Sequence, residues 1–134
     1  MATRSRIGLL LDNDYVLSVY HHWDGYPSWL GVFLQQNYTT KDQIAELLDG
    51  GDISSIESDE DWERNKLDEK IVLYYNDRGE KTEPKLDLNV EDYVENENGM
   101  CEEYAYLFVN NQWECYDLDT KLEVEIKDRG LVNV

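Results

Sequence analysis

Residues 4–22 read RSRIGLLLDNDYVLSVYHH, and this stretch predicts a β-hairpin. Two alternating segments flank Asp12-Asn13-Asp14, whose residue types favour a tight turn. A three-residue loop pairs Leu11 with Tyr15 and keeps apolar and polar residues on separate faces. A two-residue loop would mix them, so we expect the three-residue register. The apolar face then holds Ile7, Leu9, Leu11, Tyr15, Leu17 and Val19, and the polar face holds Arg4, Arg6, Ser18, Tyr20 and His22.

Two helices are expected to follow the hairpin. Pro27 suits the first turn of a helix, and apolar residues recur at helical spacing over residues 28–37. Thr40, with a glutamine three residues later, is typical of a capping box that begins a second helix over residues 41–48. Gly50-Gly51 is expected to end this helix, since glycine is common just after a helix terminus.

The segment after the helices is expected to contain two short strands. Residues 52–69 are mostly polar and predict a loop with one short helix. The apolar run at residues 71–75 predicts a strand, because it is rich in β-branched and aromatic residues. Residues 86–90 predict a shorter strand, followed by a helix or loop that continues to Gly99.

A second hairpin is predicted near the C-terminus. Residues 103–109 and 113–118 flank Asn110-Asn111, a pair that favours the tight turns of hairpins. Cys101 and Cys115 are not cross-strand partners in this register, so we expect two core thiols and no disulfide. The pairing gives one aromatic-rich face, formed by Tyr104, Tyr106, Phe108, Trp113 and Cys115, and a last strand follows through Leu122, Val124 and Ile126.

The order of these elements predicts an α+β fold on a mainly antiparallel sheet. At 134 residues the chain has the length of one domain, which we expect to span residues 1–134. The N-terminal hairpin, the two helices after it and the C-terminal hairpin all belong to this domain.

The chain is strongly acidic. It has 30 Asp and Glu residues against 12 Lys and Arg, a formal net charge of −18. Residues 1–56 carry −4 of this charge, and the strand-rich residues 57–134 carry −14. Such a charge repels phosphate backbones and anionic lipids, so we expect no direct nucleic-acid binding and no membrane binding. Two cysteines, no long apolar run and no secretory signal favour a reducing cytoplasm.

Residues 20–29 carry the densest set of chemically useful side chains. They hold four aromatic residues, both histidines and one carboxylate, where the second strand runs through Asp24-Gly25 into the first helix. Strand ends and helix N-termini commonly bind anions, because their N–H groups are free. Aromatic rings there suit stacking on a nucleobase. The candidate ligand-binding residues are Arg4, Arg6, Tyr20, His22, Trp23, Asp24 and Tyr26.

Packing alone is the main alternative for this segment. Trp23 would then plug the sheet against the first helix, and Asp24 would cap the turn. A metal site at His21 and His22 is disfavoured because neighbouring strand residues point to opposite faces, so we expect no metal and no cofactor. Acid–base catalysis by His22 with Asp24 is also open. The sequence has no nucleophile, P-loop or dinucleotide motif, so we expect binding rather than catalysis.

Four short motifs resemble a family of small proteins encoded mainly by bacteriophages and prophages. They are Arg-Ser-Arg-Ile-Gly at residues 4–8, His-Trp-Asp-Gly-Tyr-Pro at 22–27, Tyr-Thr-Thr at 38–40 and Gly-Asp-Ile-Ser-Ser at 51–55. The resemblance covers residues 3–56, and the hexapeptide is its most specific part. It implies a phage accessory protein acting in a bacterial cytoplasm, where such proteins counter host defence or redirect host enzymes.

Members of that family often carry cysteine at the position of His21, which argues against a binding role for this histidine. Packing alone would not need the two arginines of the first motif, so the resemblance favours a ligand pocket. We expect a counter-defence binding protein that sequesters a small phosphorylated, nucleotide-like ligand. The expected roles are stacking for Trp23 and Tyr26, phosphate binding for Arg4, Arg6 and His22, and a hydrogen bond to base or ribose for Asp24.

The alternative function is an acidic mimic of nucleic acid. Carboxylates at residues 57–61 and 91–97 would imitate phosphates and occupy the basic cleft of a host DNA- or RNA-binding protein. Such binding would weaken steeply with salt, whereas stacking in a pocket would not. A nucleotide-cleaving enzyme, the third class, would show turnover. Exposed aromatic residues also suit an interface between copies of the chain, so a homo-oligomer stays open.

Overall fold

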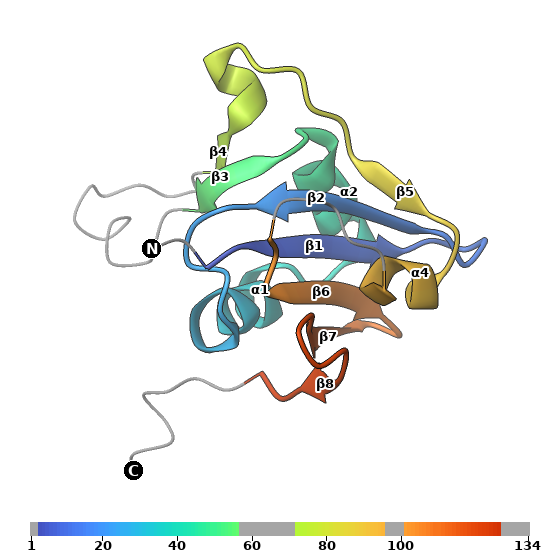
Figure 1. Cartoon of the computed structure of the whole chain (residues 1–134). Helices are drawn as coiled ribbons and strands as arrows, with labels where there is room; N and C mark the ends of the chain where they lie inside the picture. Colours follow the sequence, from blue (N-terminus) through green and yellow to red (C-terminus); the bar gives the residue numbers. More distant parts are fainter. Residues whose placement is uncertain (1–2, 57–71, 96–100, 127–134) are drawn as a thin grey trace.

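The sheet is built around the N-terminal hairpin (Figure 1). The computed structural model describes residues 3–56, 72–95 and 101–126. Their strands lie in the order β4-β3-β2-β1-β6-β7-β8, with β5 also paired to β2, and the pairs are antiparallel except β1–β6 and β2–β3. The predicted α+β fold with a mainly antiparallel sheet is confirmed. The strands are β1 (Ser5–Leu10), β2 (Val16–His21), β3 (Ile53–Ile56), β4 (Val72–Tyr74), β5 (Lys85–Asp87), β6 (Tyr104–Val109), β7 (Gln112–Asp117) and β8 (Glu123–Val124).

The hairpin has the register that its alternation predicts. In β1 and β2, Ile7 lies opposite Val19, and the Leu11 N–H donates to the Tyr15 carbonyl across the three-residue loop. Apolar and polar residues therefore occupy separate faces. The polar face, which carries Tyr20, is the one that positions the candidate site.

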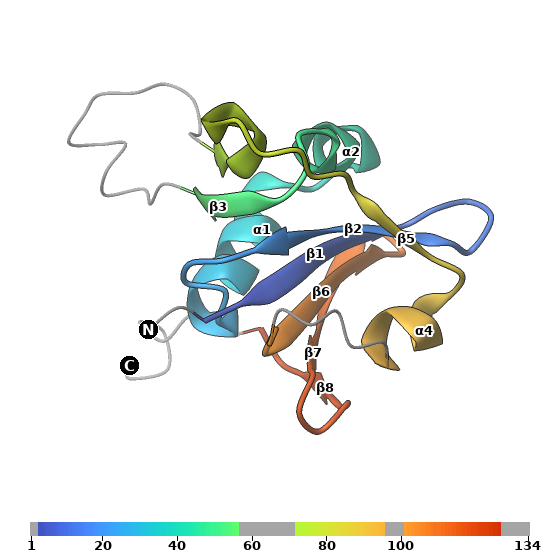
Figure 2. The ribbon, with the colours of Figure 1, turned by 45° about the horizontal axis from the view of Figure 1, so that its top comes forward.

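The helices cover the two faces unequally, as Figure 2 shows. The apolar face of the hairpin packs with α1 and α2 in the main core, and a smaller core lies between the opposite face and α4. Because α4 is short, it covers only part of its face. Tyr20 and His21 at the end of β2 are nevertheless buried, and partial exposure begins at His22. The helical elements are the π-turn η1 (Pro27–Gly31), α1 (Val32–Asn37), α2 (Lys41–Asp49), the 3-10 turn η2 (Tyr75–Arg78) and α4 (Val90–Glu95).

Both predicted helices are present, and the first one begins differently from expectation. Its first turn is a π-turn, in which the Val32 N–H donates to the Pro27 carbonyl, and regular α-helix begins only afterwards. The second helix has the predicted capping box. The Thr40 side chain accepts from the Gln43 N–H, and the Gln43 side chain accepts from the Thr40 N–H. Local capping chemistry therefore fixes this helix start.

Strand β3 shows that the loop predicted over residues 52–69 was wrong at residues 53–56. Ile53 and Ile56 are three residues apart, which does not match the two-residue period of a strand. A register shift between Ile53 and Ser55 in the pairing with β4 marks a bulge, and both isoleucines are buried. The bulge therefore hides the strand from a periodicity argument. Residues 57–69 lie outside the described part.

The C-terminal hairpin matches its prediction closely. Tyr106 lies opposite Cys115, and Phe108 lies opposite Trp113, so the predicted aromatic face enters the main core. The expectation of two core thiols holds for Cys115 only. Cys101 precedes β6 and is exposed, and both thiols are free. The turn residues Asn110 and Asn111 both have positive φ, 53° and 63°.

The shorter predicted strands are present with shifted ends. The strand expected over residues 71–75 is β4, which ends at Tyr74 where η2 begins. The strand expected over residues 86–90 is β5, which ends at Asp87, and Val90 already begins α4. The last alternating segment forms only the two-residue strand β8. Residues 96–100 lie beyond what the structure describes.

A fully buried histidine makes the fold sensitive to acid. His21 has no exposed surface, its Nδ1 lies 3.3 Å from the Ser5 hydroxyl, and its Nε2 has no hydrogen-bond partner among the described residues. Burial, with a smaller contribution from His22, lowers the pKa of His21 to about 3. His21 therefore takes up a proton near pH 6.5 in the unfolded chain, but only near pH 3 in the folded chain. Stability is lost as the pH falls below about 6.5.

We expect His21→Cys to flatten this dependence. The folded protein should lose up to about 1.4 kcal/mol per pH unit between pH 6.5 and 4 through His21, because one pKa unit corresponds to that free energy. Urea unfolding at several pH values gives the free energy of unfolding, and the slope against pH is compared between the two proteins. Parallel slopes would show that His21 does not carry the dependence. The smaller cysteine lowers absolute stability without affecting this comparison.

Candidate functional site

The candidate site arises where the outer edge of β2 changes partner. This edge pairs with β5 over Val16–Ser18 and with β3 at His21 (Figure 1). Between these pairings the Tyr20 N–H donates to the Asp52 Oδ1 at 3.0 Å, so a side chain replaces a strand partner there. The edge divides at this point and leaves a hollow of about 320 Å³.

This hollow, the split-edge pocket, joins three segments distant in sequence. The polar face of the hairpin forms one wall, the near wall. The other wall, the far wall, is formed by residues that come after α2 and around η2 in the sequence. Three of the seven residues predicted as ligand-binding line it. The lining residues are Arg4, Tyr20, His22, Asp52, Tyr75, Glu80 and Thr82.

Tyr20 and His22 form a short hydrogen bond within the pocket. The Tyr20 hydroxyl lies 2.6 Å from the Nδ1 of His22. Burial raises the pKa of Tyr20 to about 12, so the phenol keeps its proton at neutral pH. Burial and the positive charge of Arg4 lower the pKa of His22, so the imidazole is neutral. Nδ1 is engaged by Tyr20, so Nε2 is the ring nitrogen left for a ligand.

The lining has mixed charge rather than the basic character predicted. Arg4 contributes one cation, whereas Asp52 and Glu80 contribute two carboxylates. Tyr75 adds an aromatic ring, and the Arg78 guanidinium lies 5.6 Å from the centre of that ring. Among the described residues, the pocket thus offers the Arg4 guanidinium, carboxylate acceptors and an aromatic surface to a small ligand.

Asn76 holds the far wall together. Its Nδ2 donates to the carbonyls of Gly50 and Thr82 at 2.9 and 3.0 Å, and its Oδ1 accepts from the N–H and the hydroxyl of Thr82 at 2.7 and 2.9 Å. The Thr82 hydroxyl oxygen in turn accepts from the Asp52 N–H at 2.9 Å. Gly51 has φ +87°, and a Cβ there would lie 2.6 Å from the Asn76 Nδ2. This wall therefore needs both Asn76 and a glycine at position 51.

Replacing Asn76 by alanine should loosen this wall. The change removes four hydrogen bonds in a half-buried place, and we expect a loss of about 2–3 kcal/mol in the free energy of unfolding. Urea unfolding measures it. Asn37→Ala is the matched control, because the Asn37 side chain donates to the Phe33 carbonyl at 3.0 Å and its loss should cost about 1 kcal/mol or less. Equal losses in the two variants would contradict the assignment.

Arg6, predicted to bind phosphate, does not line the pocket. Its side chain is buried, with Nε 3.0 Å from the Ser18 hydroxyl and Nη1 3.3 Å from the Glu102 Oε2. Its second terminal nitrogen donates to the Ser18 carbonyl at 3.3 Å. Arg6, in β1, therefore forms a buried ion pair with Glu102, two residues before β6, and also donates to Ser18 of β2.

The other three predicted residues surround the turn after β2. Trp23 is 45% exposed, and its ring packs edge-on against His22 with centroids 4.7 Å apart, so it stands beside the pocket. Asp24 is exposed with φ 59°, and Tyr26 is the exposed residue before η1. The Gly25 carbonyl accepts from the buried Tyr106 hydroxyl at 2.7 Å, which fixes the turn. Neither Asp24 nor Tyr26 lines the pocket.

Sequence reasoning missed the far wall of the pocket. Asp52, Tyr75, Glu80 and Thr82 lie 30 or more residues after the hairpin. Asp52 belongs to the Gly-Asp-Ile-Ser-Ser motif of the resemblance but was not among the predicted ligand-binding residues, and no motif covers the other three. Gly50-Gly51 is a further local signal, because a glycine pair after a helix permits the sharp turn that brings Asp52 to the edge of β2.

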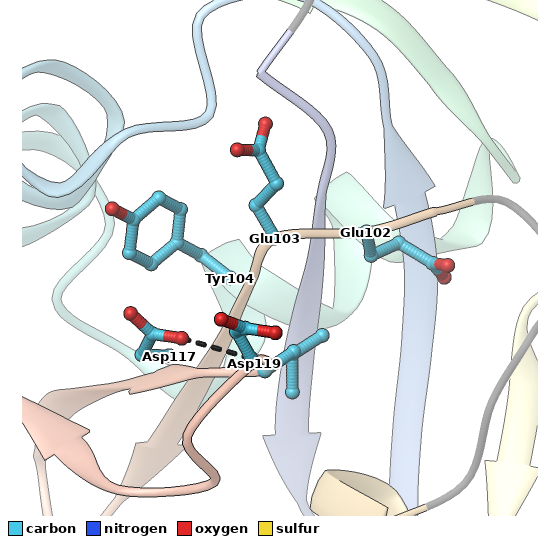
Figure 3. Close-up of a pocket in the computed structure, with 6 residues that line it drawn as sticks. Glu102, Glu103, Tyr104, Asp117 and Asp119 are labelled. Atoms are coloured by element: carbon cyan, nitrogen blue, oxygen red, sulfur yellow. Dashed lines mark hydrogen bonds between the residues drawn. The ribbon is translucent and has the colours of Figure 1, made fainter.

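A second hollow, of about 390 Å³, lies where β6 begins and β7 ends (Figure 3). In this acidic hollow the Asp119 N–H donates to the Asp117 carboxylate at 2.8 Å. The side chain of Glu102 points away from those two carboxylates, and it is the partner of Arg6. The lining residues are Glu102, Glu103, Tyr104, Asp117, Leu118 and Asp119.

Neither hollow is a metal centre in the described ranges. Within residues 3–56, 72–95 and 101–126, no group of three or more His, Cys, Asp or Glu side chains is placed to hold a metal ion. None of the helices in those ranges has the length and apolar character needed to cross a membrane. No protein-family model, curated protein or solved structure matches the chain. The interpretation of the site therefore rests on its own geometry.

Proposed function

We propose that this chain binds a small nucleotide-like ligand in the split-edge pocket and holds it without turnover. The observation that carries the proposal is the meeting of Arg4, Tyr20 and His22 with an aromatic ring, Tyr75, around one hollow. A volume of about 320 Å³ is at the small end of the range for ligand sites. It suits a mononucleotide better than a polymer.

The side chains supply complementary contacts for such a ligand. Arg4 is a donor for a phosphate group, and the Nε2 of His22 adds a second polar contact. Asp52 and Glu80 are acceptors for ribose hydroxyls or base amino groups. Tyr75 offers a ring for stacking, and Trp23, exposed beside His22, offers a second ring at the rim.

The biological role follows from the resemblance of residues 3–56 to phage-encoded proteins. A phage accessory protein that captures a nucleotide signal would lower its free concentration in the host and so blunt a defence response. Such a protein acts by stoichiometric binding. This role is part of the proposal.

Titration calorimetry against nucleoside mono-, di- and triphosphates and cyclic dinucleotides tests the binding. Arg4→Ala should weaken the binding of the tightest ligand by about tenfold or more, because a charge-assisted hydrogen bond is lost. Lys41→Ala is the control, since Lys41 pairs with Asp12 on the exposed surface and should leave binding unchanged. Unchanged binding in Arg4→Ala, or ligand breakdown detected by chromatography, would contradict the proposal.

The acidic hollow favours a second candidate function, binding of a basic host protein. Besides Glu102, which pairs with Arg6, the carboxylates of Glu103, Asp117 and Asp119 line it in a chain whose net charge is −18. Such binding depends on long-range attraction, so its affinity should fall steeply between low and high salt. Pocket binding should change much less with salt. A salt titration of any captured partner separates the two functions.

A further inference from the structure

We infer that Asp52 determines the specificity of the split-edge pocket: its carboxylate accepts a hydrogen bond from an N–H or O–H group on the nucleoside part of the ligand. This inference rests on the proposed function and specifies which part of the ligand is recognised and by which residue. A carboxylate only accepts hydrogen bonds. It therefore favours ligands that present a donor at this point and disfavours analogues that lack it.

Asp52 is held by hydrogen bonds from its backbone to its carboxylate. Its Oδ1 accepts from the Tyr20 N–H at 3.0 Å, and its own N–H donates to the Thr82 hydroxyl at 2.9 Å. Its carbonyl accepts from the Tyr75 N–H at 3.1 Å. These bonds tie Asp52 to β2 on one side and to the far wall on the other. The carboxylate is therefore in place before a ligand arrives, and little side-chain entropy is lost when it binds.

One oxygen of this carboxylate is left for a ligand. Asp52 lines the pocket and is half-buried. Among the described residues, the side chain accepts only the Tyr20 N–H, through Oδ1, so Oδ2 is left as an acceptor. Hydrogen bonds to a charged group are stronger than those between neutral groups. A donor on the ligand that reaches Oδ2 should therefore contribute substantially to affinity.

Glu80, the other carboxylate in the lining, is held differently. It is exposed, and its described hydrogen bond comes from the backbone, where its N–H donates to the Tyr75 carbonyl at 3.4 Å. Its side chain would have to be ordered during binding, which costs conformational entropy. Glu80 is therefore the matched comparison for Asp52, because it places the same charge at the same pocket on an exposed side chain.

Asp52→Asn separates recognition from the fold. The amide has the shape of the carboxylate, and its Oδ1 can keep the bond from the Tyr20 N–H. The reverse orientation would place two donors face to face, so the amino group takes the place of Oδ2. The acceptor that faces the ligand thus becomes a donor. Urea unfolding and hydrogen exchange at the Tyr20 N–H should both stay close to the wild-type values, which shows that the pocket is intact.

Titration calorimetry of the wild-type protein, Asp52→Asn and Glu80→Gln with AMP, GMP, CMP and UMP tests the inference. Asp52→Asn should weaken the binding of the tightest of these nucleotides by about tenfold or more. Charge alone predicts the opposite sign, because removal of a carboxylate beside an anionic ligand reduces repulsion. Glu80→Gln should accordingly leave the affinity unchanged or raise it.

Analogues of the same nucleotide identify the donor. They lack the 2′-hydroxyl, the 3′-hydroxyl or one N–H donor of the base. Loss of the recognised donor should weaken binding to the wild-type protein about tenfold and binding to Asp52→Asn much less, because both changes remove one bond. This comparison also tests the inference in the wild-type protein alone, where at least one analogue must lose affinity.

Equal or tighter binding by Asp52→Asn, equal effects of Asp52→Asn and Glu80→Gln, or full affinity for every analogue would overturn the inference and leave nucleotide binding intact. Absence of wild-type binding to every nucleotide would overturn the proposed function together with the inference.

Discussion

Replacement of Arg6 by methionine is expected to destabilise the fold by about 3–5 kcal/mol. The Arg6 and Glu102 side chains are only 6% and 4% exposed, and their charged groups lie 3.3 Å apart. Methionine fills much of the space of arginine and carries no charge. The Glu102 carboxylate would then be buried without a cation, and the Ser18 carbonyl and hydroxyl would lose their donors.

The double variant Arg6→Met with Glu102→Met separates this cost from simple loss of contacts. Two apolar side chains in place of a buried ion pair are often neutral, so the double variant should recover most of the stability lost by Arg6→Met. The free energy of unfolding in urea measures both. If Arg6→Met cost less than about 1 kcal/mol, the ion pair would contribute little. If the double variant were no more stable than the single one, the loss would come from packing.

Local patterns were sufficient to predict the parts of the fold that depend on neighbours in sequence. Apolar and polar residues alternate on both sides of Asp12-Asn13-Asp14. Of the two registers considered, the one with a three-residue loop keeps the apolar residues on one face and the polar residues on the other, and β1 and β2 pair in that register. The capping box at Thr40 satisfies its own N–H groups, so it indicates a helix start without help from the rest of the chain.

Long-range contacts decide what these patterns could not. The alternation of residues places Arg4 and Arg6 on the same face of the hairpin. It does not predict that Arg6 is buried, because Arg6 is buried together with its partner Glu102, which lies 96 residues later. Likewise Asp52 reaches the edge of β2 through a hydrogen bond to Tyr20, 32 residues earlier. The near wall of the pocket was therefore predictable, and the far wall was not. The bulge in β3 hid the strand that brings the two walls together.

Tyr93 should show the second large effect, because it attaches the short helix α4 to the sheet. The side chain is 1% exposed, and its hydroxyl donates to the Tyr106 carbonyl at 2.6 Å. Burial raises the pKa of this phenol, so it keeps the proton that the bond requires. Tyr93→Ala is expected to cost about 3–5 kcal/mol by leaving a cavity, whereas Tyr93→Phe should cost about 1 kcal/mol for the hydrogen bond alone.

Gly8 provides an independent check on the same contact. A Cβ at Gly8 would lie 2.8 Å from the Tyr93 hydroxyl oxygen, so Gly8→Ala should force the ring of Tyr93 away from the sheet. The Tyr93→Ala background removes that oxygen and also the ring carbon that the Cβ would approach to 2.9 Å, and we expect Gly8→Ala to cost at least about 0.5 kcal/mol less there than in the wild-type protein. Urea unfolding of the four proteins closes the cycle. Additive costs would mean that the ring does not rest on Gly8, and that α4 is held to the sheet by its other apolar contacts.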